Sequence, residues 1–111
     1  MSEVVCTRIA LNPESSALIR EWGKTLNDVR RSEALATMIQ EGVTVESYFL
    51  DSRPEGDYLI AYMRADSLEE AARVASTSAY GIDRYHQEVK EAAWGERTML
   101  EPLVDLAIER P

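Results

Sequence analysis

The chain has 111 residues, of which 45% are hydrophobic and 29% charged, and its formal net charge is -8. This length suits one domain, so we expect a single domain over residues 1–111. The acidic balance argues against nucleic-acid binding, which needs clustered positive charge, and no apolar run approaches the roughly 18 residues of a membrane span. The start lacks a secretory signal pattern, and the lone Cys6 rules out an internal disulfide. We therefore expect a cytoplasmic protein without nucleic-acid or membrane partners.

The first elements alternate between strand and helix. Residues 4–11 are rich in β-forming residues and end at Asn12-Pro13, which is typical of a helix start. The following helix should bend or restart at Ser32 and stop at Gly42. Its first half has an apolar stripe of Leu18, Trp22, Leu26 and Val29.

Residues 43–65 predict a β-hairpin that is apolar on both faces. The strands meet at residues 53–56, where Pro54 presets a turn and Gly56 can adopt a left-handed conformation. Helices can cover only one face of such a sheet. In a chain this short, a second copy of the same sheet is the natural cover for the other face.

A three-residue loop that places Arg53 opposite Asp57 would fix the register of this hairpin. Tyr48 would then face Tyr62, Glu46 would face Arg64, and Leu50 would face Ile60. These six residues would share the face left for a partner sheet or a cavity. The opposite face, under the helices, would contain Val45, Ser47, Phe49, Leu59, Ala61 and Met63.

The second half predicts two further helices and a last strand. Residues 67–70 match a capping box that starts a helix running to about Ala75. A second helix opens at Ile82 or Asp83 and stops at Gly95. Residues 97–108 are read as a strand, although Pro102 cannot donate to a ladder; a helical turn from Pro102 is the alternative. The stripe of the second helix contains Ile82, His86, Val89 and Ala93.

The order strand, helix, strand, strand, helix, strand predicts a ferredoxin-like α+β fold, with an antiparallel four-stranded sheet and helices on one face. Arg8, Glu21-Trp22 and the segments at 41–47 and 82–86 resemble an uncharacterised bacterial family within the dimeric α+β barrel superfamily. The resemblance implies a homodimer whose sheets pack face to face. The superfamily includes cofactor-free monooxygenases, lactone isomerases and haem-degrading enzymes, so fold analogy selects no reaction.

His86 is the only histidine and the first candidate for chemistry, as a general base. The alternative is a helix residue at the border of an apolar stripe, satisfied by a nearby carboxylate or carbonyl. A weaker alternative is haem binding or degradation, because the resemblance implies a histidine iron ligand on the corresponding helix. No other feature of the sequence indicates haem binding.

Glu46 and Arg64 form the second candidate, as a predicted cross-strand ion pair that Arg8 could join. With Tyr48 and Tyr62 at its sides, such a cluster would suit a small carboxylate or phenolic ligand, since arginine recognises anions in bidentate fashion. A structural ion pair at a dimer seam is the alternative.

We expect no cofactor and no metal, because one histidine and one cysteine cannot assemble a zinc site and no phosphate-binding loop is present. Two functions remain. The first is a homodimeric binding or accessory module that uses its sheet face to dimerise, which predicts no functional pocket. The second is a cofactor-free monooxygenase or isomerase for a small aromatic or lactone-like compound, which predicts a cavity between helices and sheet. We favour the module, because no catalytic constellation is complete in sequence.

Overall fold

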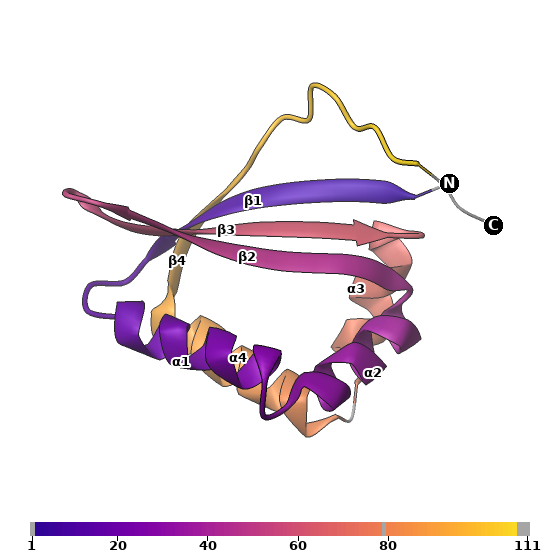
Figure 1. Cartoon of the computed structure of the whole chain (residues 1–111), viewed down its shortest axis with the longest axis horizontal. Coiled ribbons are helices and arrows are strands. Elements are labelled where there is room, and N and C mark those ends of the chain that lie inside the picture. The colour runs from indigo at the N-terminus through magenta and orange to yellow at the C-terminus, as the bar shows by residue number, and fades with distance from the viewer. Residues whose placement is uncertain (1, 79, 109–111) are drawn as a thin grey trace.

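The structure is a computed structural model that describes residues 2–78 and 80–108. These residues contain one antiparallel sheet of four strands in the order β2-β3-β1-β4. Figure 1 shows the helices on one side of this sheet, so the ferredoxin-like α+β prediction is confirmed. The strands are β1 (Glu3–Leu11), β2 (Val43–Arg53), β3 (Gly56–Ala65) and β4 (Trp94–Met99).

Four helices in the described residues cover the sheet: α1 (Ser16–Asn27), α2 (Arg31–Glu41), α3 (Leu68–Ser76) and α4 (Gly81–Ala93). None of them is long and apolar enough to cross a membrane. The larger core lies where α1 and α4 pack on β1 and β3, and a smaller one lies near α3. The larger core contains Ile9, Ile19, Trp22, Leu59, Val89 and Ala93.

The local end signals of two helices are confirmed. The Ser67 hydroxyl accepts a hydrogen bond from the Glu70 backbone N–H at 3.2 Å and so caps α3. Gly42 ends α2 with a positive φ of 73°, and its N–H donates to the last turn of the helix. These signals act within a few residues of the chain, which is why the sequence is sufficient to find them.

Two expectations near α1 are wrong. The helix begins at Ser16, and the Asn12 side chain instead donates to the Ala92 carbonyl at 3.1 Å. Asn12 therefore ties the end of β1 to the end of α4 and does not cap α1. Val29 falls in the turn after α1, where 84% of its surface is exposed.

The predicted register of the β2–β3 hairpin is wrong by one residue. Arg53 pairs with Gly56 across a two-residue loop, so that Tyr48 faces Ala61 and not Tyr62. The irregularity lies at the far end of β2, near Val45. A shift of one residue moves every β2 side chain to the other face of the sheet. Glu46, Tyr48 and Leu50 therefore lie on the helix side.

The chain beyond β4 forms neither the predicted strand to Ile108 nor a helical turn from Pro102. Residues 100–108, called here the C-terminal segment, cross the face of the sheet that carries no helices, called here the outer face (Figure 1). Leu100 donates its backbone N–H to the Cys6 carbonyl at 2.9 Å. Further along, Asp105 forms an ion pair with Arg64.

Candidate functional site

A cavity lies between the helices and the sheet and is called here the helix-side cavity. It consists of two adjoining hollows of about 530 and 520 Å³. The first is bordered by α1, α2, β2 and one residue of α4, and the second by α2, α3, α4 and the sheet. Thr37, Glu46, Tyr48 and His86 line both hollows and so mark where they meet. The cavity predicted for an enzyme is therefore present.

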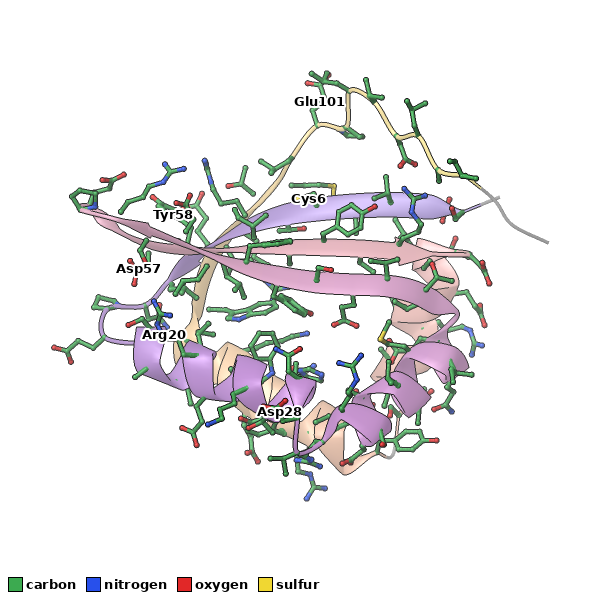
Figure 2. All side chains as sticks on the ribbon, viewed as in Figure 1. Cys6, Arg20, Asp28, Asp57, Tyr58 and Glu101 are labelled. Carbon is green, nitrogen blue, oxygen red and sulfur yellow. The ribbon has the colours of Figure 1, made fainter. Side chains whose placement is uncertain are left out.

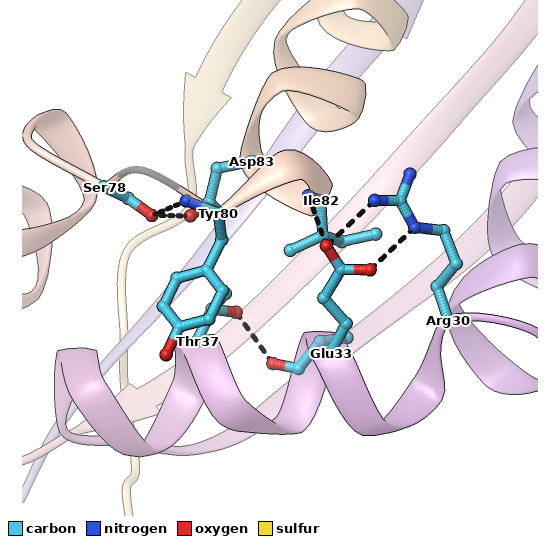
Figure 3. A network of polar contacts seen from close by, with 8 residues as sticks. Arg30, Glu33, Thr37, Ser78, Tyr80, Ile82 and Asp83 are labelled. Atoms are coloured by element: carbon cyan, nitrogen blue, oxygen red, sulfur yellow. Dashed lines mark hydrogen bonds and ion pairs between the residues drawn. The ribbon is translucent and has the colours of Figure 1, made fainter.

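A polar network between α2 and the start of α4 positions the wall that carries His86 (Figure 3). The Glu33 carboxylate accepts a 2.9 Å hydrogen bond from the Ile82 backbone N–H and also pairs with Arg30. Arg30 together with this N–H lowers the pKa of Glu33. The Ser78 hydroxyl donates to Asp83 within the first turn of α4. These contacts fix the first turn of α4 next to α2.

His86 is held by Trp22, a fully buried residue of α1. The Trp22 indole N–H donates to Nδ1 of His86 at 3.0 Å. An indole nitrogen only donates, so Nδ1 must be the acceptor and neutral His86 carries its proton on Nε2. Burial lowers the pKa of His86, against an opposing effect of the Glu46 charge, which favours this neutral form. His86 is thus a hydrogen-bond donor at Nε2, and Nδ1 is not free to act as a base.

Glu46 and Tyr48 form a second polar pair on β2. The Tyr48 hydroxyl donates to Glu46 Oε1 at 2.6 Å, and the Tyr48 ring packs edge-on against Trp22 with centroids 4.6 Å apart. Burial, assisted by the Glu46 charge, raises the pKa of Tyr48 well above its usual value. The phenol therefore stays neutral and fixes the position of the carboxylate.

Two further groups in the cavity were missed by the sequence analysis. Glu41, at the end of α2, lines the second hollow, where burial and then the Asp83 charge raise its pKa to about 7. Lys90 lies one turn beyond His86, and burial lowers its pKa. The spacing of Asp83, His86 and Lys90 places all three on one face of a helix, a signal that was available in the sequence.

Arg8, Tyr62 and Arg64 lie on the outer face, separated by the sheet from Glu46, Tyr48 and His86. Arg64 donates to the Tyr62 hydroxyl at 3.3 Å and pairs with Asp105. The predicted Glu46–Arg64 pair is therefore wrong, and the expected arginine and glutamate cradle is not assembled. Figure 2 shows Cys6 and Tyr58 on this same outer side.

The Arg8 guanidinium lies 5.4 Å from the centre of the Tyr58 ring. A hollow of about 450 Å³ lies between the C-terminal segment and the outer face, and Cys6, Tyr62 and Arg64 border it. Within residues 2–78 and 80–108, no three histidine, cysteine or acidic side chains are placed to hold a metal ion. The site residues that share a chamber are thus Glu46, Tyr48 and His86.

The family of unknown function DUF6176 matches residues 2–110. The chain belongs to this family. No curated protein matches the sequence.

Solved structures share the fold at low sequence identity. A NIPSNAP-like domain protein from Burkholderia xenovorans has a TM-score of 0.58 at 15% identity, over 97% of this chain and 91% of that chain. SnoaB, a cofactor-independent oxygenase from Streptomyces nogalater, has a TM-score of 0.56 at 9% identity, over 95% and 96%. A dimeric protein with a ferredoxin-like fold from Bacteroides fragilis has a TM-score of 0.51 at 16% identity, over 87% and 91%. These likenesses agree with the superfamily suggested by the sequence.

Proposed function

We propose that the protein is a homodimeric binding module that holds a small organic ligand in its helix-side cavity. The bound ligand goes beyond the module expected from sequence, which had no functional pocket. It is supported by the cavity, whose two hollows meet at Glu46, Tyr48 and His86. Concave sites with apolar walls and a few convergent polar groups are the usual form of small-molecule sites. The aromatic rings of Trp22 and Tyr48 offer flat walls for a planar ligand.

The outer face supports the homodimer. Phe49 on β2 is 59% exposed there, and four large apolar side chains of the C-terminal segment are more than 70% exposed. Large apolar side chains exposed in such number are typical of an interaction site. A second copy of the sheet would cover it, and the Bacteroides fragilis protein with a ferredoxin-like fold is dimeric. The four side chains are Leu103, Val104, Leu106 and Ile108.

A cofactor-free enzyme is the second candidate, and the Nε2–H of His86 favours it. In residues 2–78 and 80–108 no group hydrogen-bonds to that nitrogen, so it is available to stabilise an oxygen of a bound compound. This role differs from the general base expected from sequence. A monooxygenase or isomerase acting on a small aromatic or lactone-like compound would then use His86 as donor and Glu46 or Glu41 as proton acceptor.

Haem binding does not fit the same geometry. An imidazole that binds iron through Nε2 carries its proton on Nδ1. The Trp22 N–H already points at Nδ1 of His86, so a proton on Nδ1 would face another hydrogen-bond donor. The residues around His86 therefore oppose the haem alternative.

The proposal also places the protein in the cytoplasm, without a nucleic-acid partner. Cys6 is a free thiol, which suits a reducing compartment. The net charge of -8 repels a phosphate backbone.

Native mass spectrometry of protein gently purified from cells tests the dimer and the ligand together. We expect a dimer that carries one small molecule per chain, lost on denaturation. A monomer would overturn the dimer. Ala71 is a small buried residue beside the second hollow. The variant Ala71→Leu should fill the space and abolish binding of the ligand. The matched control is Ala92→Leu on the exposed side of α4. Retention of the ligand in Ala71→Leu would place it outside the cavity.

A further inference from the structure

The chain has only two lysines, and they lie in opposite environments. Lys24 is exposed on α1. Lys90 is half-buried on α4 and lines the helix-side cavity, with Nζ 4.9 Å from the centre of the Trp94 ring. Within residues 2–78 and 80–108, Lys90 has no ion-pair partner within 4.0 Å and donates no side-chain hydrogen bond. The described residues thus hold its amine by a cation–π contact with Trp94, and no carboxylate binds it.

The charged groups around Lys90 come from four elements. Burial lowers its pKa first, the positive charge of Arg97 on β4 lowers it further, and three carboxylates oppose both effects. The net result is a larger share of neutral amine than an exposed lysine has. Burial and a neighbouring cation are the two means by which proteins activate a lysine as a nucleophile. The facing groups are Glu41 from α2, Glu46 from β2, Asp83 and His86 from α4, and Arg97 from β4.

Glu41 adds a proton donor to the same hollow. Its pKa of about 7 means that the carboxyl is protonated in a substantial fraction of molecules at neutral pH. It forms no ion pair with Lys90 within 4.0 Å, so both groups stay available in the cavity. A neutral amine and a weak acid are the two groups that imine formation requires.

We propose that Lys90 forms an imine with a small aldehyde or ketone bound in the helix-side cavity, and that Glu41 supplies the proton for the loss of water. This inference rests on the cavity of the proposed function and names the class of compound that it takes. The apolar part of the compound would lie against Leu68 and Ala71. The His86 Nε2–H would bind a polar substituent.

The step balances without an oxidant or a reductant. The lone pair of the Lys90 nitrogen attacks the carbonyl carbon, and the nitrogen gives up one proton as the carbonyl oxygen becomes a hydroxyl. Glu41 then protonates this hydroxyl, which leaves as water while the nitrogen lone pair forms the C=N bond, and the resulting iminium returns its N–H proton to the Glu41 carboxylate. The carbonyl oxygen and both amine hydrogens leave as one water molecule.

Reductive trapping tests the inference on the full chain. Purified protein is incubated with benzaldehyde and sodium cyanoborohydride at neutral pH. Peptide mass spectrometry then identifies the labelled lysines and distinguishes them from a labelled N-terminal amine. We expect one benzyl group per chain on Lys90, added at least about tenfold faster than on Lys24. Equal rates at the two lysines would overturn the inference.

Matched variants separate the roles. Lys90→Arg keeps the charge but has no primary amine, so fast labelling should disappear, while Lys24→Arg should leave it unchanged. Glu41→Gln should slow labelling of Lys90 about tenfold. An unchanged rate in Glu41→Gln would contradict the role of Glu41. Circular dichroism of each variant verifies the fold.

A non-carbonyl probe distinguishes failure of this inference from failure of the proposed function. Phenol has a similar shape to benzaldehyde and cannot form an imine, and its binding is measured by saturation-transfer NMR. Phenol binding to wild type and Lys90→Arg without selective labelling of Lys90 would overturn the imine and leave the binding cavity standing. Absence of both signals would overturn both.

Discussion

The two faces of the same sheet differ in burial and in the contacts of their polar groups. On the helix side, Glu46 and Tyr48 lie in a chamber with His86, and the pKa values of the buried groups are shifted. On the outer face, Phe49 is exposed and Arg64 is occupied by Asp105. Neighbouring residues of one strand thus divide between the chamber to which we assign the ligand and the surface to which we assign the dimer. One residue of register therefore decides which of these two surroundings a β2 side chain has.

The largest expected effect on the outer face is on association. Phe49→Glu adds a charge to a surface that we propose is buried in the dimer, and we expect the dimer dissociation constant to rise at least about a hundredfold. Analytical ultracentrifugation measures the change. Ser52→Glu, an exposed position near the hairpin tip, is the control with the same added charge. An intact dimer in Phe49→Glu would show that the outer face is not the interface.

Trp22 should give the largest loss of stability on the helix side. Trp22→Ala removes a ring that is 1% exposed and should cost about 3–5 kcal/mol of unfolding free energy, measured in urea. Trp22→Phe retains most of the packing but removes the indole donor to His86. We expect the Nδ1-protonated tautomer of His86 to appear in the nitrogen NMR spectrum of Trp22→Phe only. An identical nitrogen spectrum in wild type and Trp22→Phe would mean that Trp22 does not set the tautomer of His86.

Glu41 should make stability depend on pH. Its pKa rises from 4.5 to about 7 on folding, so the native state binds more protons than the unfolded state between these values. The contribution of Glu41 to stability is therefore lost as pH rises through this window. After allowance for partial exposure, Glu41→Gln should be more stable than wild type by about 1 kcal/mol above pH 7, with no gain below pH 4.5. Glu88→Gln, exposed on α4, should show no such difference in urea unfolding.

The features that sequence predicted are those with local causes. The cap at Ser67 and the stop at Gly42 depend on a few adjacent residues, and the stripe of α4 that includes His86 follows from helical spacing. The order of elements then sufficed for the ferredoxin-like fold. The protonation state of His86 was harder to predict, because the partner that sets its tautomer, Trp22, lies on another helix.

The register could not be predicted because β2 is apolar on both faces. Alternation therefore did not distinguish Val45 and Phe49 from Tyr48 and Leu50, and a loop containing Pro54 and Gly56 permits more than one length. The Tyr48 ring packs on Trp22 from α1, a contact distant in sequence. The meeting of Glu41 and Lys90 in one hollow is equally non-local.

The C-terminal segment should give the smallest effect on stability. Asp105→Ala removes the ion pair with Arg64, and the carboxylate is one-third exposed, so the cost should stay below about 1 kcal/mol. Amide hydrogen exchange over residues 100–108 should nevertheless accelerate, because the described residues show few other anchors for this segment beyond the Leu100 N–H bond to Cys6. Glu101→Ala, exposed and near the start of the same segment, is the control. Unchanged exchange in Asp105→Ala would mean that apolar contacts with a second copy, and not Arg64, hold the segment on the outer face.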